Sequence, residues 1–499
     1  MDRVSTTPSI VGRVARLLRR PDRGGCRTVF DVPAARTWLA VAAVTAAGLI
    51  GCSSTRDEGS APADPLLTAQ RPTSTQPTSP PARQPLALVY NLHRPTLDLD
   101  LEQARRLVNH RRMTWAELGQ PGGAVRLRTG RSALRQVERN SAVVAVLPAS
   151  QVRPTVQVAR VDGVDPLRSP ERYPLTTSST ESAPVVTTVT VVGDIMLGRR
   201  VGEAAAAAGD PGAPLRHMQR RLARTDLTIG NLESTLSTAG GPRQGSDSFA
   251  ADPAVLPALT DAGFELLSLA NNHTGDFGPR AFRQTMHRID RTSIARVGAG
   301  VNSRASWRPT VLRANGLRFG FVAFNAIGET PRATSTHPGV AEVRMSPRTG
   351  PLNLSDLHRL TTTIRALARR TDVVIALPHW GEQYTTVPVP DQRRVGAAMI
   401  DAGADLVVGG HAHWVQGIQM HRRHLIVNCL GNFIFDMDFS RQTEEGVVLE
   451  LVFWGDDLMA ARFQPYAIGA EFAPRPAYGP RARQTLHRMW RASDPPFRR

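Results

Sequence analysis

The segment from Asp405 to Trp414 constrains the fold more than any other stretch of the chain. An apolar run, Leu406–Val408, predicts a buried strand, and two glycines end it. His411 and His413 follow, with one residue between them. In a tight turn at a strand end both imidazoles can face one point, which is how proteins hold transition metals. His-x-His alone is weak evidence, but a strand followed by metal-capable residues recurs upstream.

Four upstream apolar runs end in polar residues in the same way, at Val186–Val192, Leu227–Ile229, Leu266–Leu269 and Val373–Leu377. Helical stretches between them predict a mostly parallel or mixed sheet with helices on both faces. In such sheets, ligands bind outside the carboxyl ends of the strands. The sequence therefore predicts a shell for two divalent metals, drawn from Asp194, Glu233, Asn272, His273, His379, His411 and His413.

Each of these residues also has an ordinary structural explanation. Asp194 could cap the following helix, and Asn271 and Asn272 could be turn residues. A single histidine is usually a surface or hydrogen-bonded side chain. The ordered recurrence of such residues at strand ends is what favours the metal site.

Six ordered motifs carry a resemblance to a known family. They are Gly-Asp-Ile-Met-Leu (193–197), Asn-Leu-Glu (231–233), Leu-Ala-Asn-Asn-His (269–273), His-Trp-Gly-Glu (379–382), Gly-His-Ala-His (410–413) and Leu-Gly-Asn-Phe-Ile-Phe-Asp (430–436). Residues 185–470 resemble the CapA family of capsule (poly-γ-glutamate) synthesis proteins. The resemblance implies an α/β fold, a calcineurin-like metallophosphoesterase-type sandwich of sheets flanked by helices.

The resemblance also implies roles for the residues at the strand ends. Glu233 replaces a bridging aspartate, and Met196 stands where the wider pattern has a histidine ligand. One metal position then keeps Glu233, Asn272, His379 and His411, and the other keeps Asp194, Glu233 and His413. The implied cofactor is one or two divalent ions of manganese, zinc or iron, and the implied general acid is His273.

Such a site supports hydrolysis, because a metal lowers the pKa of bound water and polarises a carbonyl or phosphoryl oxygen. His273 can protonate a leaving group, since the pKa of histidine is near working pH. We expect a metal-dependent hydrolase of the cell envelope in capsule or poly-γ-glutamate-type polymer biosynthesis, export or anchoring. The alternative is a non-catalytic polymer-binding or scaffold protein on the same fold.

Charged residues near the motifs are candidates for substrate binding. Arg199, Arg200 and Arg243 could bind a polyanion, or could simply be solvated. Glu382 is either a partner of His379 or a solvated loop carboxylate. The formal net charge is +18, and every basic residue is Arg. Nucleic acid is not an expected partner, because no aromatic-and-basic motif accompanies the charge; an anionic envelope polymer or an anionic lipid surface is compatible with it.

The N-terminal region predicts a membrane anchor. Trp38–Ile50 is apolar but short and Gly/Ala-rich for a membrane-spanning helix, and it ends in Leu49-Ile50-Gly51-Cys52. This ending resembles a bacterial lipobox, which implies a signal segment at 1–52, lipidation of Cys52 and a location on the extracytoplasmic face of the cell membrane. The alternative is an ordinary signal peptide with a chance cysteine.

Composition divides the rest of the chain. Residues 53–85 are rich in Ser, Thr and Pro and predict a flexible tether. Residues 86–175 predict a small α/β domain that resembles one lobe of a phosphate-type substrate-binding protein, too short for both lobes. The metal domain follows at 185–470, and residues 471–499 are expected to form a basic C-terminal tail. The sequence identifies no protein partner.

Overall fold

The computed structural model describes residues 83–499 apart from 131, 180 and 181. The predicted signal segment, with Cys52, and most of the predicted tether lie outside the described residues. The first strand, β1 (Arg83–Asn91), begins inside the range predicted as tether. No helix of the described part is both long and apolar enough to span a bilayer.

A small mixed sheet forms the first domain, in the strand order β3-β4-β1-β5, with β7 paired to β1. Its main helix, α1, begins at a capping box in which Asp100 and Gln103 bond each other's backbone N–H groups. The bounds are β2 (Asp98–Leu99), α1 (Leu101–Val108), β3 (Arg126–Arg128), α2 (Ala133–Arg139), β4 (Val143–Pro148), β5 (Val156–Val158), β6 (Arg160–Val161) and β7 (Thr176–Ser178).

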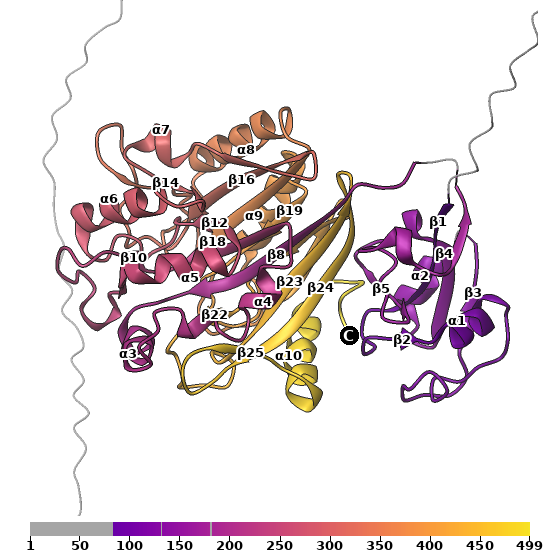
Figure 1. Ribbon diagram of the computed structural model, residues 1–499. Coiled ribbons are helices and arrows are strands. Elements are labelled where there is room, and N and C mark those ends of the chain that lie inside the picture. The colour runs from indigo at the N-terminus through magenta and orange to yellow at the C-terminus, as the bar shows by residue number, and fades with distance from the viewer. Residues whose placement is uncertain (1–82, 131, 180–181) are drawn as a thin grey trace, which may run out of the picture. The chain divides into compact units, whose positions relative to one another are not determined.

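The second domain contains two large sheets (Figure 1). The first has the order β13-β12-β9-β8-β23-β24-β25, with β22 also paired to β8. Strands β8, β9, β12 and β13 are parallel, whereas β23 runs antiparallel to β8. The bounds are β8 (Val186–Ile195), β9 (Leu227–Leu232), β12 (Phe264–Ser268), β13 (Ala295–Val297), β22 (Asn432–Ile434), β23 (Glu445–Trp454), β24 (Asp457–Ile468) and β25 (Pro474–Pro476).

The second sheet has the order β15-β16-β18-β19-β21-β20. Its central strands β16, β18, β19 and β21 are parallel, and both edge strands are antiparallel to their neighbours. The bounds are β15 (Thr310–Ala314), β16 (Leu317–Asn325), β18 (Val373–His379), β19 (Leu406–Val408), β20 (Ile418–His421) and β21 (His424–Val427).

The hydrophobic core shows how these sheets are layered. One cluster joins the inner faces of both sheets, with Val191 and Ile229 on the first and Phe321 and Ile375 on the second. A second cluster packs α5 (Leu256–Asp261) and α6 (Gly278–Ile289) on the outer face of the first sheet. A third packs α8 (Leu354–Ala368) and α9 (Pro390–Asp401) on the second sheet. The predicted sandwich of sheets flanked by helices is confirmed.

Residues 471–499, expected to form a basic tail, instead contribute β25 and the helix α10 (Gly479–Ala492). Met489, Trp490 and Phe497 are buried in the core cluster between the sheets. The arginines of α10 are exposed or partly exposed. The helix is therefore amphipathic, which the high number of basic residues made difficult to recognise in the sequence. The C-terminal segment is therefore part of the folded domain.

Candidate metal centre

The carboxyl ends of the parallel strands bring the predicted ligands together. Asp194 of β8 pairs with Asn231 of β9, and His379 of β18 is bridged to Gly410 after β19. The six predicted metal ligands are between 0% and 3% exposed, so the site is buried; they are Asp194, Glu233, Asn272, His379, His411 and His413. The strand-end argument therefore placed all six at one site.

The turn after β19 aims both histidines of the His-Ala-His motif. His411 and His413 have positive φ values of 92° and 56°, which are uncommon for side-chain-bearing residues. Gly410 precedes them because a Cβ there would lie 2.5 Å from Oδ1 of Asp194. The backbone N–H of His411 donates to Oδ2 of Asp194 at 3.0 Å, which ties this turn to β8. The tight packing fixes the direction of both imidazoles.

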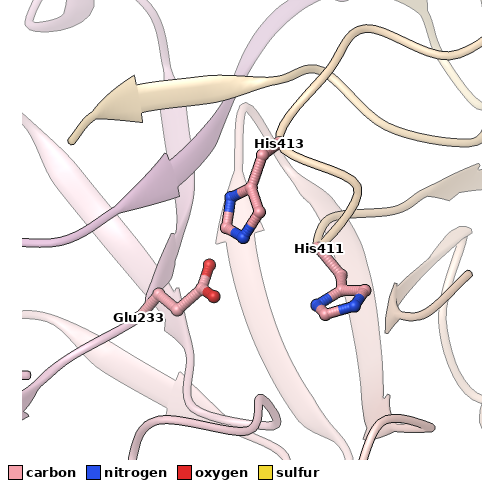
Figure 2. A group of neighbouring side chains, drawn as sticks. All are labelled: Glu233, His411 and His413. Atoms are coloured by element: carbon pink, nitrogen blue, oxygen red, sulfur yellow. The ribbon is translucent and has the colours of Figure 1, made fainter. Parts of the chain in front are cut away.

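Glu233, His411 and His413 form one group, whose potential ligand atoms lie within 4.8 Å of one another. Figure 2 shows their side chains projecting toward a common space. Both ring nitrogens of His411 and Oε1 of Glu233 are buried without a hydrogen-bond partner among the described residues. Native structures seldom leave buried polar atoms unpaired, and an absent ion is one accepted reason for doing so.

His413 is also oriented as a ligand. The side-chain N–H of Asn432 donates to the carbonyl of Thr443 at 3.0 Å, so its Oδ1 is the atom facing Nδ1 of His413, at 2.8 Å. Nδ1 must therefore carry the proton, and Nε2 keeps its lone pair. Such a partner on the far ring nitrogen is typical of histidines that bind metals.

Burial dominates the electrostatics of the site. It raises the pKa of Glu233 to about 8, and burial together with the charge of Glu233 raises the pKa of Asp194 to about 7. Burial lowers the pKa of His379 to about 4 and that of His413 to about 3. A bound divalent cation would lower the pKa of both carboxyl groups, because it stabilises ionised oxygens. It would also keep the imidazoles neutral, since a metal binds the unprotonated nitrogen.

A second group contains Asp194, Glu233 and His379. The predicted division placed His379 with His411 and Asp194 with His413, and the imidazoles of His379 and His411 do lie close together, with ring centroids 5.0 Å apart. His379 contacts Asn231 of β9 at 3.2 Å, and His411 and His413 lie in the same turn after β19. Glu233 belongs to both groups, as the prediction of a shared carboxylate required.

Asn272 lies beside His379 and accepts a hydrogen bond on Oδ1 from Nε2 of that ring, at 2.8 Å. Its side-chain N–H donates to Oε2 of Glu329 at 2.7 Å. Arg348 binds the other oxygen of Glu329 at 3.0 Å. Asn272 is therefore held from both sides within the site.

Met196 stands where the wider family pattern has a histidine ligand. It is fully buried in the hydrophobic cluster of the first sheet, and its Sδ accepts from the N–H of Gly198 at 3.1 Å. The side chain thus belongs to the core and not to the site.

His273, the predicted general acid, lies at the edge of the first group. Nε2 is 3.9 Å from Oε1 of Glu233, and Nδ1 is 2.8 Å from Oδ2 of Asp276. The ring stacks on Phe249 with centroids 3.9 Å apart. Burial lowers the pKa of His273, but the bond to Asp276 and the charge of Glu233 outweigh burial and raise it. The structure therefore favours a protonated imidazole at the site.

The predicted substrate-binding arginines are mostly paired with carboxylates. Arg199 forms an ion pair with the buried Asp436, and its guanidinium lies over Phe249 at 4.4 Å. Arg200 binds Asp438 at 2.8 Å. Arg243 is exposed, and its backbone N–H bonds Asp276. Glu382 is exposed. Of these predicted residues, Arg199 is the one that contacts the ring stacked on His273.

Four residues of the site were missed by sequence reasoning: Asn231, Asp276, Glu329 and Asn432. Asn231 and Asn432 lie inside motifs that were recognised, but a motif does not say which way an amide points. Asp276 follows His273 by three residues, which was an available signal. Glu329 lies in a loop with no motif, so nothing in the sequence indicated it.

The donor set fits a divalent metal. Two imidazoles and a carboxylate converge with unpaired atoms, and imidazole with carboxylate suits zinc, manganese or iron.

Comparisons with known proteins agree with this architecture. The model of the family described as "Bacterial capsule synthesis protein PGA_cap" matches residues 188–437. The chain is 30% identical over 315 residues to the Bacillus anthracis capsule biosynthesis protein CapA, covering 62% of this chain and 72% of that protein. It is 27% identical over 267 residues to the Bacillus subtilis PGA biosynthesis protein CapA, covering 53% and 67%.

A solved structure of a hypothetical protein from Thermus thermophilus aligns with 18% identity and a TM-score of 0.35. The alignment covers 56% of this chain and 99% of that one, and its score is too low to support a functional argument. The family model and the Bacillus anthracis relative together suffice: the chain belongs to the bacterial capsule synthesis protein (PGA_cap, CapA-like) family.

Proposed function

We propose that this protein is a metal-dependent hydrolase of a capsule-type or poly-γ-glutamate-type polymer, or of its precursor. One observation carries the proposal: both nitrogens of His411 and one oxygen of Glu233 are buried and unpaired at the point where His413 also faces. A polymer-binding protein has no need of such a set, because unpaired buried polar atoms cost stability.

The chemistry follows from the residues around that point. A bound divalent metal supplies acidified water and polarises the oxygen of the scissile group. Glu233, His411 and His413 would hold it. The imidazolium of His273 would give its Nε2 proton to the leaving group, while Asp276 would hold the ring in place and keep the second proton on Nδ1. The site is compatible with an amide, an ester or a phosphoester.

The substrate class is proposed from the family and from charge. Two relatives are named for capsule and PGA biosynthesis. The chain has a formal net charge of +18, which favours an anionic polymer over a cationic one. Arg199 is connected to the site through Phe249, since its guanidinium lies 4.4 Å from the centroid of the ring that stacks on His273.

We also propose lipid anchoring through Cys52 on the extracytoplasmic face of the cell membrane, supported by the lipobox-like sequence. A Cys52→Ala variant should stay unprocessed by the lipoprotein peptidase. Mass spectrometry that finds an unmodified mature N-terminus elsewhere would contradict the anchor and would leave the metal site unaffected.

The enzymatic proposal is tested with the metal-free protein, reloaded with manganese or zinc, and poly-γ-glutamate, peptidoglycan fragments or phosphodiesters as substrates. His273→Ala should retain metal while kcat falls by roughly a hundred- to ten-thousand-fold. His287→Ala, a change on the helix α6, is the matched control and should keep full activity. Metal binding without any turnover would favour the non-catalytic alternative.

A further inference from the structure

A side-chain amide donor contacts all three residues of the second ligand group. Nδ2 of Asn231 lies 2.8 Å from Oδ1 of Asp194, 3.2 Å from Nδ1 of His379 and 3.4 Å from Oε2 of Glu233. These three neighbours are the same residues that form the group. One amide nitrogen therefore contacts every residue that a cation would need there.

The orientation of the Asn231 amide is fixed by its neighbours. Oδ1 of Asn271 accepts from the backbone N–H groups of His273 and Thr274 and from the Thr274 hydroxyl. The Asn271 side-chain N–H groups must then be donors, and one reaches Oδ1 of Asn231 at 3.0 Å. The NH₂ of Asn231 is thus the end that faces the carboxylates, because the reversed amide would place two N–H groups against each other.

The hydrogen bonds that run from Glu329 through Asn272 and His379 to Asn231 give the same orientation of the Asn231 amide. The carboxylate of Glu329 only accepts, so Asn272 donates to it and turns Oδ1 toward His379. Nε2 of His379 must then carry the ring proton, and Nδ1 accepts from Asn231. Both ends give one direction of donation, so the arrangement is internally consistent.

His379 and His413 consequently differ as ligands. Asn432 offers an oxygen to His413 and leaves Nε2 free for a metal. Asn231 offers a nitrogen to His379, which fixes the ring proton on Nε2, the atom that faces Asn272. Binding an ion between His379 and Asn272 would require this hydrogen-bond chain to reverse or break.

We propose that Asn231 sets the metal stoichiometry: its amide N–H₂ replaces a cation in the Asp194, Glu233 and His379 group, so that a single ion binds tightly, at Glu233, His411 and His413. The inference deepens the proposed function and rests on it only for the presence of a metal. The protein would then bind one ion tightly, although it contains two groups of candidate ligands.

The test measures metal binding, not turnover. The full-length protein is stripped with a chelator and titrated with Mn²⁺ or Zn²⁺, and bound metal is counted by elemental analysis after equilibrium dialysis. The wild type should bind one ion tightly and a second at least about tenfold more weakly, the usual size of effects from hydrogen-bond partners of ligands. Two ions of equal affinity, or none, would overturn the inference.

Two substitutions sharpen the result. Asn231→Asp replaces the donor with an oxygen ligand and should give two tight ions. Asn231→Ser keeps a hydroxyl that can donate or accept, adds no charge, and should strengthen the second site by about tenfold. Asn353→Asp makes the same chemical change at the N-cap of α8, outside the site, and should behave as wild type. One tight ion in both Asn231 variants would contradict the proposal.

If Asn231→Asp does not fold, the proposal is tested with Asn231→Ser and with a direct measurement of the protonation of His379. Nitrogen NMR of the metal-free wild type should show His379 protonated on Nε2, with its signal identified by loss in His379→Gln. A proton on Nδ1 would overturn the inference. One tight ion without hydrolysis would refute the proposed function alone, whereas two equal ions with hydrolysis would refute only the role of Asn231.

Discussion

Two buried glutamates in the same domain have opposite environments. Glu445, at the start of β23, is 1% exposed, and Glu233, after β9, is 0% exposed. Glu445 accepts from Arg441 at 2.6 Å, from Arg481 at 3.0 Å and from Thr485 at 2.8 Å, and Arg488 binds it too. Glu233 keeps one oxygen without a hydrogen-bond partner in the described part of the chain.

The pKa values follow this difference. Burial raises the pKa of Glu445, but the hydrogen bonds from Arg441 and Thr485 and the charge of Arg488 outweigh it, so the net pKa is lowered. For Glu233 burial dominates, and the pKa rises to about 8. A carboxylate satisfied by the protein serves structure, here by holding α10 against β23. An unsatisfied carboxylate at equal burial has the environment expected of a metal ligand.

The largest expected effect is on metal retention. Glu233→Gln should reduce bound metal from about one ion per chain to near zero, because it removes a shared carboxylate ligand. Metal at a hundred times its Kd should stabilise the wild type by about 2.7 kcal/mol and leave the variant unchanged. Elemental analysis and thermal unfolding measure both quantities. A variant that retains its metal would show that the unpaired oxygen has another purpose.

Glu445→Gln is the matched substitution and should affect stability instead. The substitution leaves three partly exposed arginines without their carboxylate, and because solvent screens these charges we expect a loss of about 1 to 2 kcal/mol in the free energy of unfolding. Urea denaturation in the presence of a chelator measures it. Metal content of the folded variant should match that of the wild type, and a parallel loss of metal would mean that the two regions are coupled.

Metal affinity should depend on pH. The pKa of Glu233 in the metal-free protein is raised to about 8, and binding at Glu233, His411 and His413 requires this carboxylate to be ionised. Affinity should therefore fall by tenfold or more as pH decreases from about 8 to about 6, following the one decade per unit that each displaced proton contributes. Calorimetric titration with Mn²⁺ measures it, and an affinity independent of pH would contradict the assignment of Glu233 as a ligand.

The smallest expected effect is on the stability of the protein at acidic pH. The folded pKa of Glu445 is lowered, so its stabilising contribution is complete above the unfolded pKa of about 4.3 and disappears as pH falls through the folded value. The difference in stability between wild type and Glu445→Gln should accordingly shrink below about pH 4. Denaturation curves at neutral pH and in acid compare the two, and a difference that persists in strong acid would argue for a packing role without ionisation.

Much of the site could be predicted because strand ends are a local property. Leu406–Val408 is a strand with those bounds in the structure, and the apolar runs before Asp194, Glu233 and His379 are strands as well. Parallel strands place their carboxyl ends at one edge, so six ligands could be assigned without coordinates. The burial of Met196 could not be predicted in this way. Met196 follows the last residue of β8, and the alternation along the strand does not say where its side chain packs.

The sequence by itself determined the family, through the order of its motifs, and with the family the α/β sandwich; it also named the candidate ligands, because they follow apolar runs along the chain. Only the tertiary structure showed which candidate ligands lie close enough to share an ion, since they come from strand ends of two different sheets. It alone fixed the direction of the amides of Asn231 and Asn432. Hydrogen-bond direction is a property of neighbours in space, and residues from several separate strand ends and loops set it here.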